Sequence, residues 1–130
     1  MEKKKILVVD DERDFVDIVK LRLESENFEV ITAYDGAQAL DRVAKDHPDA
    51  VLLDIMMPNL DGLSVLKRIR KQDKNLPVFM LTAFSNDERF KIADKFNASG
   101  FMVKTGDLKK EIDNINIALN IADKYKGQNK

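Results

Sequence analysis

The sequence predicts an α/β fold in which helices cover both faces of one parallel β-sheet. Short apolar runs alternate with longer segments whose apolar residues recur every three or four positions, which is the period of an amphipathic helix. The run from Ala50 to Leu53 is apolar throughout, as is typical of a strand that is buried on both faces. Five strand–helix units in series therefore predict right-handed crossovers and a single doubly wound sheet.

The elements follow from the spacing of apolar residues and from the residues that begin or end helices. Asp35 and Gln38 form a capping-box pattern at the start of a helix, and Pro48 ends that helix. A second such pattern joins Ser85 and Glu88. The predicted strands cover Lys5 to Val9, Phe28 to Ala33, Ala50 to Leu53, Pro77 to Leu81 and Phe101 to Val103. The predicted helices cover Asp14 to Ser25, Ala37 to Lys45, Leu63 to Arg70, Phe90 to Phe96 and about Leu108 to Tyr125.

Five strands suit the flavodoxin-like order 2-1-3-4-5, flanked by five helices. The 130 residues fit a single domain, 1–130, with an ordered core over about residues 4–125 and a short polar tail. Such a tail is expected either in a stand-alone domain or in one cut from a longer protein.

Composition limits the classes of function. There are 22 Lys and Arg residues against 23 Asp and Glu, and a formal net charge of −1 gives no electrostatic case for direct nucleic acid or membrane binding. The chain has no cysteine, which excludes disulfides and is compatible with a cytoplasmic protein. Neither a signal peptide nor a membrane span is predicted.

Reactive side chains follow four of the predicted strands. Asp10 and Asp11 follow the first strand, Asp54 the third, Thr82 the fourth and Lys104 the fifth. In an open parallel sheet, ligands bind beyond the carboxyl ends of the strands. The order 2-1-3-4-5 sets the first and third strands side by side, about 4.8 Å apart, so the three acids are expected to meet.

Such a cluster has defined chemistry. Two carboxylates about 4 Å apart repel each other by about 4 kcal/mol at an effective dielectric constant near 20, so three together would protonate or recruit a cation. Mg²⁺ suits the site because it binds one or two carboxylates together with waters and phosphate oxygens. An Asp carboxylate can also act as a nucleophile and form an acyl phosphate, whose oxygens need a cation and hydroxyl donors nearby.

Five motifs together resemble the CheY-like receiver domain of two-component response regulators, over essentially the whole chain. They are Val9-Asp10-Asp11, Asp54-Ile-Met-Met-Pro58, Asp61-Gly62, Thr82-Ala83, and Phe101 followed by Lys104. Each motif is weak alone, whereas their order, spacing and position at strand ends form a specific set.

The resemblance implies roles for individual residues. It makes Asp54 the phosphoacceptor and places Mg²⁺ on Asp10, Asp11, Asp54 and the backbone carbonyl of Met56. Thr82 and Lys104 would bind the phosphoryl oxygens, and Thr82 and Phe101 would form the switch.

The resemblance also implies partners. The phosphodonor would be a histidine kinase or a histidine phosphotransfer protein, which docks on the first helix near Phe15 and Ile18. The fourth helix, fifth strand and fifth helix would form the face that changes affinity for a target protein or a missing output domain. Ile117 and Ile121 either contribute to a partner or phosphorylation-dependent dimer face or belong to a wider core stripe. The chain is then a signalling domain, not an enzyme in the ordinary sense.

Several alternatives stay open at this point. Asp10 and Asp11 could cap the first helix, and Phe101 could be a core residue. Thr105 follows Lys104 where the family usually has proline, so the bond between them is either trans or a strained cis bond that costs about 3–4 kcal/mol. A pseudo-receiver that never carries phosphate is one competing function, and a Mg²⁺-dependent phosphohydrolase is another.

Overall fold

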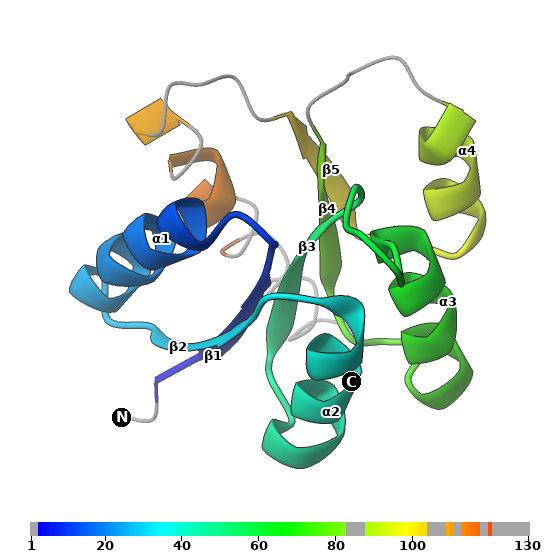
Figure 1. Cartoon of the computed structure of the whole chain (residues 1–130). Helices are drawn as coiled ribbons and strands as arrows, with labels where there is room; N and C mark the ends of the chain where they lie inside the picture. Colours follow the sequence, from blue (N-terminus) through cyan, green and yellow to red (C-terminus); the bar gives the residue numbers. More distant parts are fainter. Residues whose placement is uncertain (1–2, 83–87, 104–108, 111–112, 118–119, 121–130) are drawn as a thin grey trace.

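The structure is a computed structural model that describes residues 3–82, 88–103, 109–110, 113–117 and 120. Five parallel strands form one sheet in the order β2-β1-β3-β4-β5 (Figure 1). The strands are β1 (Lys5–Val9), β2 (Glu29–Ala33), β3 (Ala50–Asp54), β4 (Val78–Thr82) and β5 (Gly100–Val103). The helices are α1 (Arg13–Ser25), α2 (Gly36–Asp46), α3 (Gly62–Gln72) and α4 (Glu88–Lys95). The predicted flavodoxin-like fold and strand order are confirmed.

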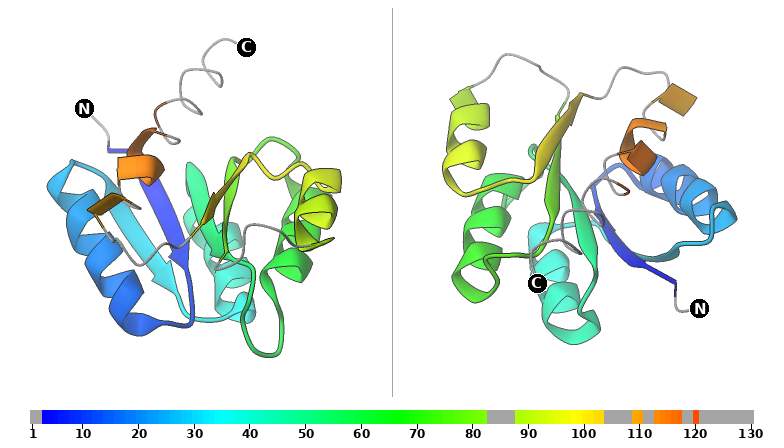
Figure 2. Two further views of the ribbon diagram at one scale, coloured as in Figure 1. Left: turned by 90° about the horizontal axis from the view of Figure 1, so that it is seen from above. Right: turned by 180° about the vertical axis from the view of Figure 1, so that it is seen from behind.

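Helices lie on both faces of the sheet. Helix α1 covers one face, and α2, α3 and α4 cover the other (Figure 2). Residues 109–110, 113–117 and 120 are also helical, in agreement with the predicted final helix, whose other residues lie outside the described part. Ile115 packs into the same core as α1, so this helical segment lies on the α1 face. No helix in the described residues is long and apolar enough to cross a membrane.

The central strands are buried on both faces because successive side chains alternate between two cores. In β1, Leu7 and Val9 belong to the core beneath α2, α3 and α4, while Ile6 and Val8 belong to the core beneath α1. All five residues of β3 and all five of β4 are buried. This explains why the sequence shows continuous apolar runs there instead of an alternating pattern.

Local signals at the helix ends act largely as predicted. The Asp35 side chain accepts a hydrogen bond from the Gln38 amide (2.8 Å), and the Gln38 side-chain oxygen accepts one from the Tyr34 amide (2.9 Å). This capping box therefore reaches one residue further back than the standard pattern. His47 ends α2 in a left-handed conformation (φ 50°), directly before Pro48. The second predicted box involves residues 85–87, which lie outside the described residues.

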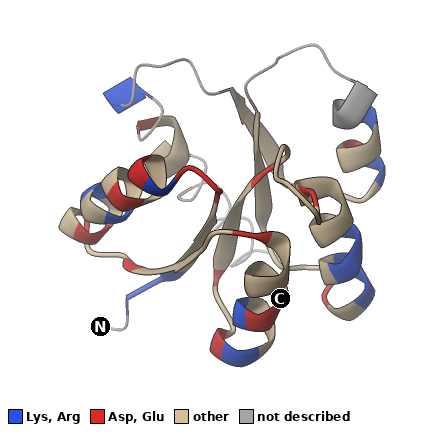
Figure 3. Ribbon diagram, viewed as in Figure 1, with Lys and Arg blue, Asp and Glu red and all other residues tan. Residues whose placement is uncertain are grey.

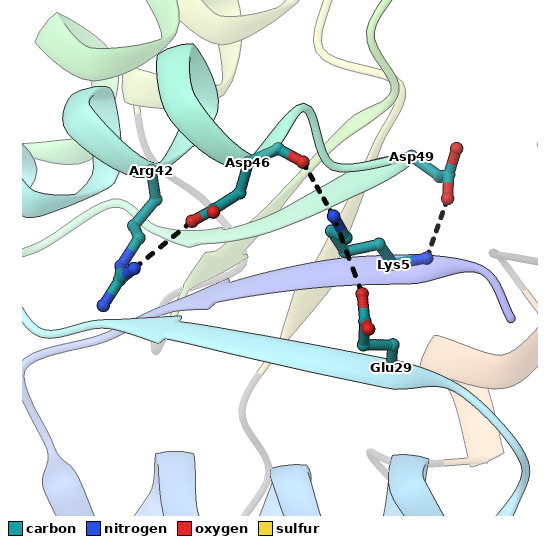
Figure 4. Close-up of polar contacts among 5 residues, drawn as sticks. All are labelled: Lys5, Glu29, Arg42, Asp46 and Asp49. Atoms are coloured by element: carbon teal, nitrogen blue, oxygen red, sulfur yellow. Dashed lines mark hydrogen bonds and ion pairs between the residues drawn. The ribbon is translucent and has the colours of Figure 1, made fainter.

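Paired polar groups connect β1, β2 and the α2–β3 connection at the amino edge of the sheet, where the strands begin (Figure 4). Lys5 Nζ donates to the carbonyl of Asp46 (3.0 Å) and lies 3.6 Å from Glu29 Oε2. The Lys5 amide donates to Asp49 Oδ2 (2.7 Å), and Arg42 pairs with Asp46 (3.3 Å). Each of these acidic side chains therefore has a cation or a backbone amide as its partner.

A buried arginine connects α3 to the end of α4 at the same edge. The Arg70 side chain is only 9% exposed, and its guanidinium donates to the carbonyls of Phe96 (3.1 Å), Asn97 (2.9 Å) and Asp73 (3.1 Å). Burial lowers the pKa of Arg70 from its usual value, and the Asp73 carboxylate opposes that shift. Arg70 thus satisfies three main-chain carbonyls where two helices end.

Candidate functional site

The carboxyl edge of the sheet brings together the acids that follow β1 and β3. These strands are neighbours and pair Val9 with Leu53, so Asp10 and Asp54 occupy the next position on each strand. The backbone amide of Asp10 donates to the carbonyl of Ala33 (3.2 Å), which continues the pairing between β1 and β2. The sheet register therefore fixes both aspartates.

Asp10, Asp11 and Asp54 form one carboxylate cluster, whose ligand atoms lie within 4.8 Å of one another. Figure 3 shows acidic ribbon segments at the ends of β1 and β3. The Asp10 side chain is fully buried, Asp54 is 5% exposed, and Asp11 is exposed to solvent. Three carboxyl groups thus converge at the edge of the sheet, as the sequence predicted.

The two buried acids make the same type of local turn. Asp10 Oδ1 accepts from the Glu12 amide (3.0 Å), and Asp54 Oδ1 accepts from the Met56 amide (3.3 Å). A carboxylate has acceptor sites for about four hydrogen bonds, so a local turn and a metal ion can share one carboxylate. Neither Asp10 nor Asp11 is the N-cap of α1, because that residue is Glu12, whose side chain makes no capping bond. The capping interpretation of the Asp pair is therefore wrong.

Thr82 extends the site along the edge. It is the last residue of β4, directly after Leu81, which pairs with Asp54, and it is 2% exposed. Phe101 lies in β5 opposite Met80, is half-buried and packs against the core under α3 and α4. Thr82 and Phe101 therefore lie on the two neighbouring strands, β4 and β5, that separate the cluster from the edge of the sheet at β5. Lys104 and the Lys104–Thr105 bond lie outside the described residues.

The loop between β3 and α3, residues 55–61, passes beside the cluster. The Ile55 amide donates to the carbonyl of Leu81 (2.9 Å), and the Gly62 amide donates to the carbonyl of Ile55 (2.9 Å). Pro58 followed by the left-handed Asn59 (φ 69°) is a combination that type II turns favour. These bonds and this turn fix both ends of the segment that contains the Met56 carbonyl.

Three features near the cluster were missed by reasoning from the sequence. Asp61 is the N-cap of α3 and accepts from the Ser64 amide (2.9 Å), which an Asp at the start of an apolar helical pattern could have suggested. Gly62 packs directly against the backbone of Asp54, a contact across the β3–α3 loop that the spacing of apolar residues does not indicate. Arg13 lies over the ring of Tyr34, with its guanidinium carbon 4.1 Å from the ring centre.

The apolar residues expected at partner surfaces differ in exposure. On α1, Phe15 is half-buried and Ile18 is 41% exposed. On the final helical segment Ile115 is buried, whereas Ile117 is 57% exposed. The hypothesis that Ile117 belongs to a wider core stripe of its helix is therefore wrong. Ile121 lies outside the described residues.

The donor set fits a hard divalent cation. All three side chains of the cluster offer carboxylate oxygens, and Mg²⁺ is usually held by one or two carboxylates while it keeps several waters. Every buried side-chain nitrogen or oxygen in the described residues has a hydrogen-bond partner, so no buried polar atom there is left without one. The buried side chains of Asp10 and Asp54 are therefore held by hydrogen bonds at the edge of the sheet.

Comparison with known proteins identifies the family. Residues 6–116 match the family model of the response regulator receiver domain. The chain belongs to this family. It is thus a receiver domain of the kind found in two-component systems, and its family is a signalling family.

The similar proteins agree with this assignment. The alkaline phosphatase synthesis transcriptional regulatory protein PhoP of Bacillus subtilis is 47% identical over 87 residues, which cover 67% of this chain and 35% of that protein. The matched region thus spans about a third of this curated relative. The chemotaxis protein CheY4 of Vibrio cholerae superposes with a TM-score of 0.82 at 28% identity, covering 90% of this receiver domain and 99% of CheY4. The response regulator TrrA of Thermotoga maritima, solved in complex with Mg²⁺–BeF, gives 0.77 at 34% identity, covering 88% and 98%.

Proposed function

We propose that this receiver domain accepts a phosphoryl group on Asp54, from a histidine kinase or a histidine phosphotransfer protein, and thereby switches its affinity for a target. The observation that carries the proposal is the cluster of Asp10, Asp11 and Asp54, whose ligand atoms lie within 4.8 Å at the ends of adjacent strands. Membership of the receiver family supports it, and the proposal implies a cytoplasmic protein.

The proposed reaction is a direct transfer. A carboxylate oxygen of Asp54 attacks phosphorus, while the bond from phosphorus to the donor imidazole nitrogen or acyl oxygen breaks and the donor leaves with that electron pair. The product is an acyl phosphate on Asp54. The buried position of Asp54 at a strand end keeps this oxygen at a fixed place in the edge of the sheet.

The proposed metal ligands are Asp10, Asp11, Asp54 and the backbone carbonyl of Met56. Mg²⁺ bound there would supply positive charge to offset the charge of the phosphoryl oxygens. The Mg²⁺–BeF complex of TrrA, 34% identical to this chain, supports such a site. The local turns at Asp10 and Asp54 would orient both carboxylates by holding one oxygen of each.

The proposed switch runs from Asp54 toward β5. The hydroxyl of Thr82 and the ammonium group of Lys104 would donate to the new phosphoryl oxygens. The movement of Thr82 would let the half-buried Phe101 repack against α3 and α4 and so change the face formed by α4, β5 and the final helix. Such coupling stabilises one of two pre-existing states, typically by about 1–3 kcal/mol.

The proposed docking and target surfaces use exposed apolar groups. Ile18, beside Phe15 on α1, would receive the helix that carries the phosphodonor histidine. The exposed Ile117 would contribute to the target face or to a phosphorylation-dependent dimer. The target is either a separate protein or an output domain.

Intact mass spectrometry tests the function. After incubation with Mg²⁺ and acetyl phosphate, the parent protein should gain one phosphoryl group that alkali removes, as expected for an acyl phosphate. The Asp54→Ala variant should gain none, and the parent protein should gain none when EDTA is added. A phosphoryl group on Asp54→Ala, or none on the parent with either acetyl phosphate or a phosphorylated histidine phosphotransfer protein, would contradict the proposal.

A further inference from the structure

Two glycines from different helices contact the loop of residues 55–61 that contains the Met56 carbonyl. Gly62 begins α3 and Gly36 begins α2, and both are buried. A Cβ added at Gly36 would lie under 3.0 Å from Leu60, and one added at Gly62 would lie under 3.0 Å from Asp54 and Ile55. Real Cβ atoms in proteins essentially never come so close to another atom. The loop is therefore in direct contact with the starts of two helices.

Gly62 contacts the proposed acceptor residue itself. A Cβ there would collide with the main-chain carbonyl oxygen of Asp54 and would lie 2.9 Å from both the Asp54 carbonyl carbon and Ile55 Cα. Because all of these atoms belong to the backbone, no side-chain rotation relieves the contact. Gly62 thus fixes the distance between the start of α3 and the end of β3.

Gly36 contacts the other end of the same loop. A Cβ there would lie 2.7 Å from the carbonyl oxygen of Leu60 and 2.9 Å from both Cβ and Cδ2 of Leu60. The Asp35 side chain caps α2 directly before this contact, so the start of the helix is itself held in place. Helix propensity alone favours Ala over Gly by up to about 1 kcal/mol. If Gly36→Ala lowers stability or Mg²⁺ affinity, the cause must therefore be the contact with Leu60 and not helix propensity.

We propose that Gly36 is a positioning residue for the metal site. Because glycine has no side chain, the start of α2 can pack closely against Leu60. This contact, together with the one at Gly62, determines the position of the Met56 carbonyl relative to Asp54. The three atoms nearest to an added Cβ on Gly36 all belong to Leu60, so the proposed role of Gly36 acts through Leu60. The inference rests on the proposed function, in which the Met56 carbonyl is a ligand of Mg²⁺.

The test changes this contact from both sides. Gly36→Ala adds a methyl group to this contact, and Leu60→Ala removes the outer side-chain atoms of Leu60, Cδ2 included, that pack against Gly36. The matched control is Gly100→Ala, whose Cβ would meet only the ring of Phe79, at 3.2 Å, at the opposite edge of the sheet. Mg²⁺ affinity is measured by isothermal titration calorimetry, and urea unfolding confirms that each variant is folded at the temperature used.

Both contact variants should raise the Kd for Mg²⁺ about tenfold, the lower end of what is lost when a group that orients a metal ligand is removed. Gly100→Ala should leave the Kd unchanged. An unchanged Kd in either contact variant, or an equal rise in Gly100→Ala, would overturn the proposal. If Gly36→Ala does not fold, Leu60→Ala against Gly100→Ala decides, because Leu60 is only half-buried and its truncation adds no atom to the contact.

A second measurement separates this inference from the proposed function. Without Mg²⁺, exchange of the Gly62 amide hydrogen reports on the bond to the Ile55 carbonyl that closes the loop. Both contact variants should speed this exchange, and Gly100→Ala should not. Faster exchange in a protein that binds no Mg²⁺ would contradict the proposed function alone, whereas unchanged exchange would overturn the positioning role.

Discussion

The two edges of the sheet use charge in opposite ways. At the amino edge, Lys5 and Arg70 donate to main-chain carbonyls, and the acids there meet a cation or an amide. At the carboxyl edge, the side chains of Asp10, Asp11 and Asp54 converge within 4.8 Å. Like charges at such distances repel, whereas a cation bonded to carbonyl oxygens stabilises the structure around it.

The difference separates stability from function within one small sheet. Lys5 joins β1 to the end of α2 and to β2, and Arg70 joins α3 to the residues that follow α4, so these contacts hold elements together. The acids at the carboxyl edge instead form the proposed site for a cation and a phosphoryl group. Substitutions at the two edges should therefore differ in their response to Mg²⁺.

The largest effect on stability is expected at Arg70. Arg70→Met keeps most of the apolar stem but leaves the carbonyls of Phe96, Asn97 and Asp73 without their donor. We expect the free energy of unfolding to fall by about 3 kcal/mol. Urea unfolding measures it, with the exposed Arg68→Met on the same helix as control, which should change by about 0.5 kcal/mol or less. Equal midpoints for the two variants would show that the Arg70 bonds do not stabilise the amino edge.

The carboxyl edge should respond to Mg²⁺ itself. At a free Mg²⁺ concentration one hundred times its Kd, the parent protein should gain about 2.7 kcal/mol of stability. Asp11→Asn, which removes the exposed charge of the cluster, should lose most of this gain. Asp46→Asn should keep the full gain in stability from Mg²⁺, because Asp46 lies at the amino edge, where it pairs with Arg42. The measurement is urea unfolding with excess Mg²⁺ and with EDTA, and a full gain in Asp11→Asn would contradict the proposed ligand.

Lys5→Met tests the amino edge more gently. The variant loses the bond to the Asp46 carbonyl and the partly exposed pair with Glu29, so we expect a loss of about 1 kcal/mol. Mg²⁺ affinity should stay unchanged, because Lys5 lies at the opposite end of β1 from Asp10. The control is Lys45→Met, which removes an exposed pair with Asp41 and should change stability by less than about 0.5 kcal/mol. A change in Mg²⁺ affinity would show that the two edges are coupled.

The smallest effect is expected at the end of α2, where His47 is left-handed (φ 50°). Glycine adopts this conformation without steric cost, so His47→Gly should raise the free energy of unfolding by about 0.5–1 kcal/mol. Thermal unfolding measures the gain. Because His47 is exposed, His47→Ala serves as the control that removes the same side chain without relieving the backbone. A gain in His47→Ala equal to that in His47→Gly would assign the effect to the side chain instead.

Much of the fold and the convergence of the acids could be predicted from the sequence. β1 has the predicted bounds, Lys5–Val9, because charged residues flank a short apolar run on both sides. The other described elements differ mostly by one or two residues at their ends, where capping and fraying decide. The strand order then brings Asp10 beside Asp54, since strands one and three are neighbours. The roles of Thr82, Phe101 and Lys104 remain predictions.

The contacts between distant parts of the backbone could not be predicted. Arg70 ends a stretch of helical spacing, and nothing near it in the sequence indicates that its guanidinium binds the carbonyls of Phe96 and Asn97. The approach of Gly62 to the Asp54 backbone likewise depends on how α3 packs against β3. Sequence periodicity assigns a residue to a face of its element, but not to a partner in another element.

The three acceptors of Arg70 have a consequence for sequence drift within the family. Because every amino acid has a main-chain carbonyl, the partners at Asp73 and Phe96 can change residue type without loss of the bond. Position 97 tolerates fewer residue types, because the left-handed backbone of Asn97 (φ 60°) favours asparagine or glycine. Arg70 itself has no substitute, since lysine lacks the planar fork that reaches three oxygens at once. Mutational scanning of this junction should therefore find the least tolerance of substitution at Arg70, an intermediate tolerance at Asn97, and the most at Asp73 and Phe96.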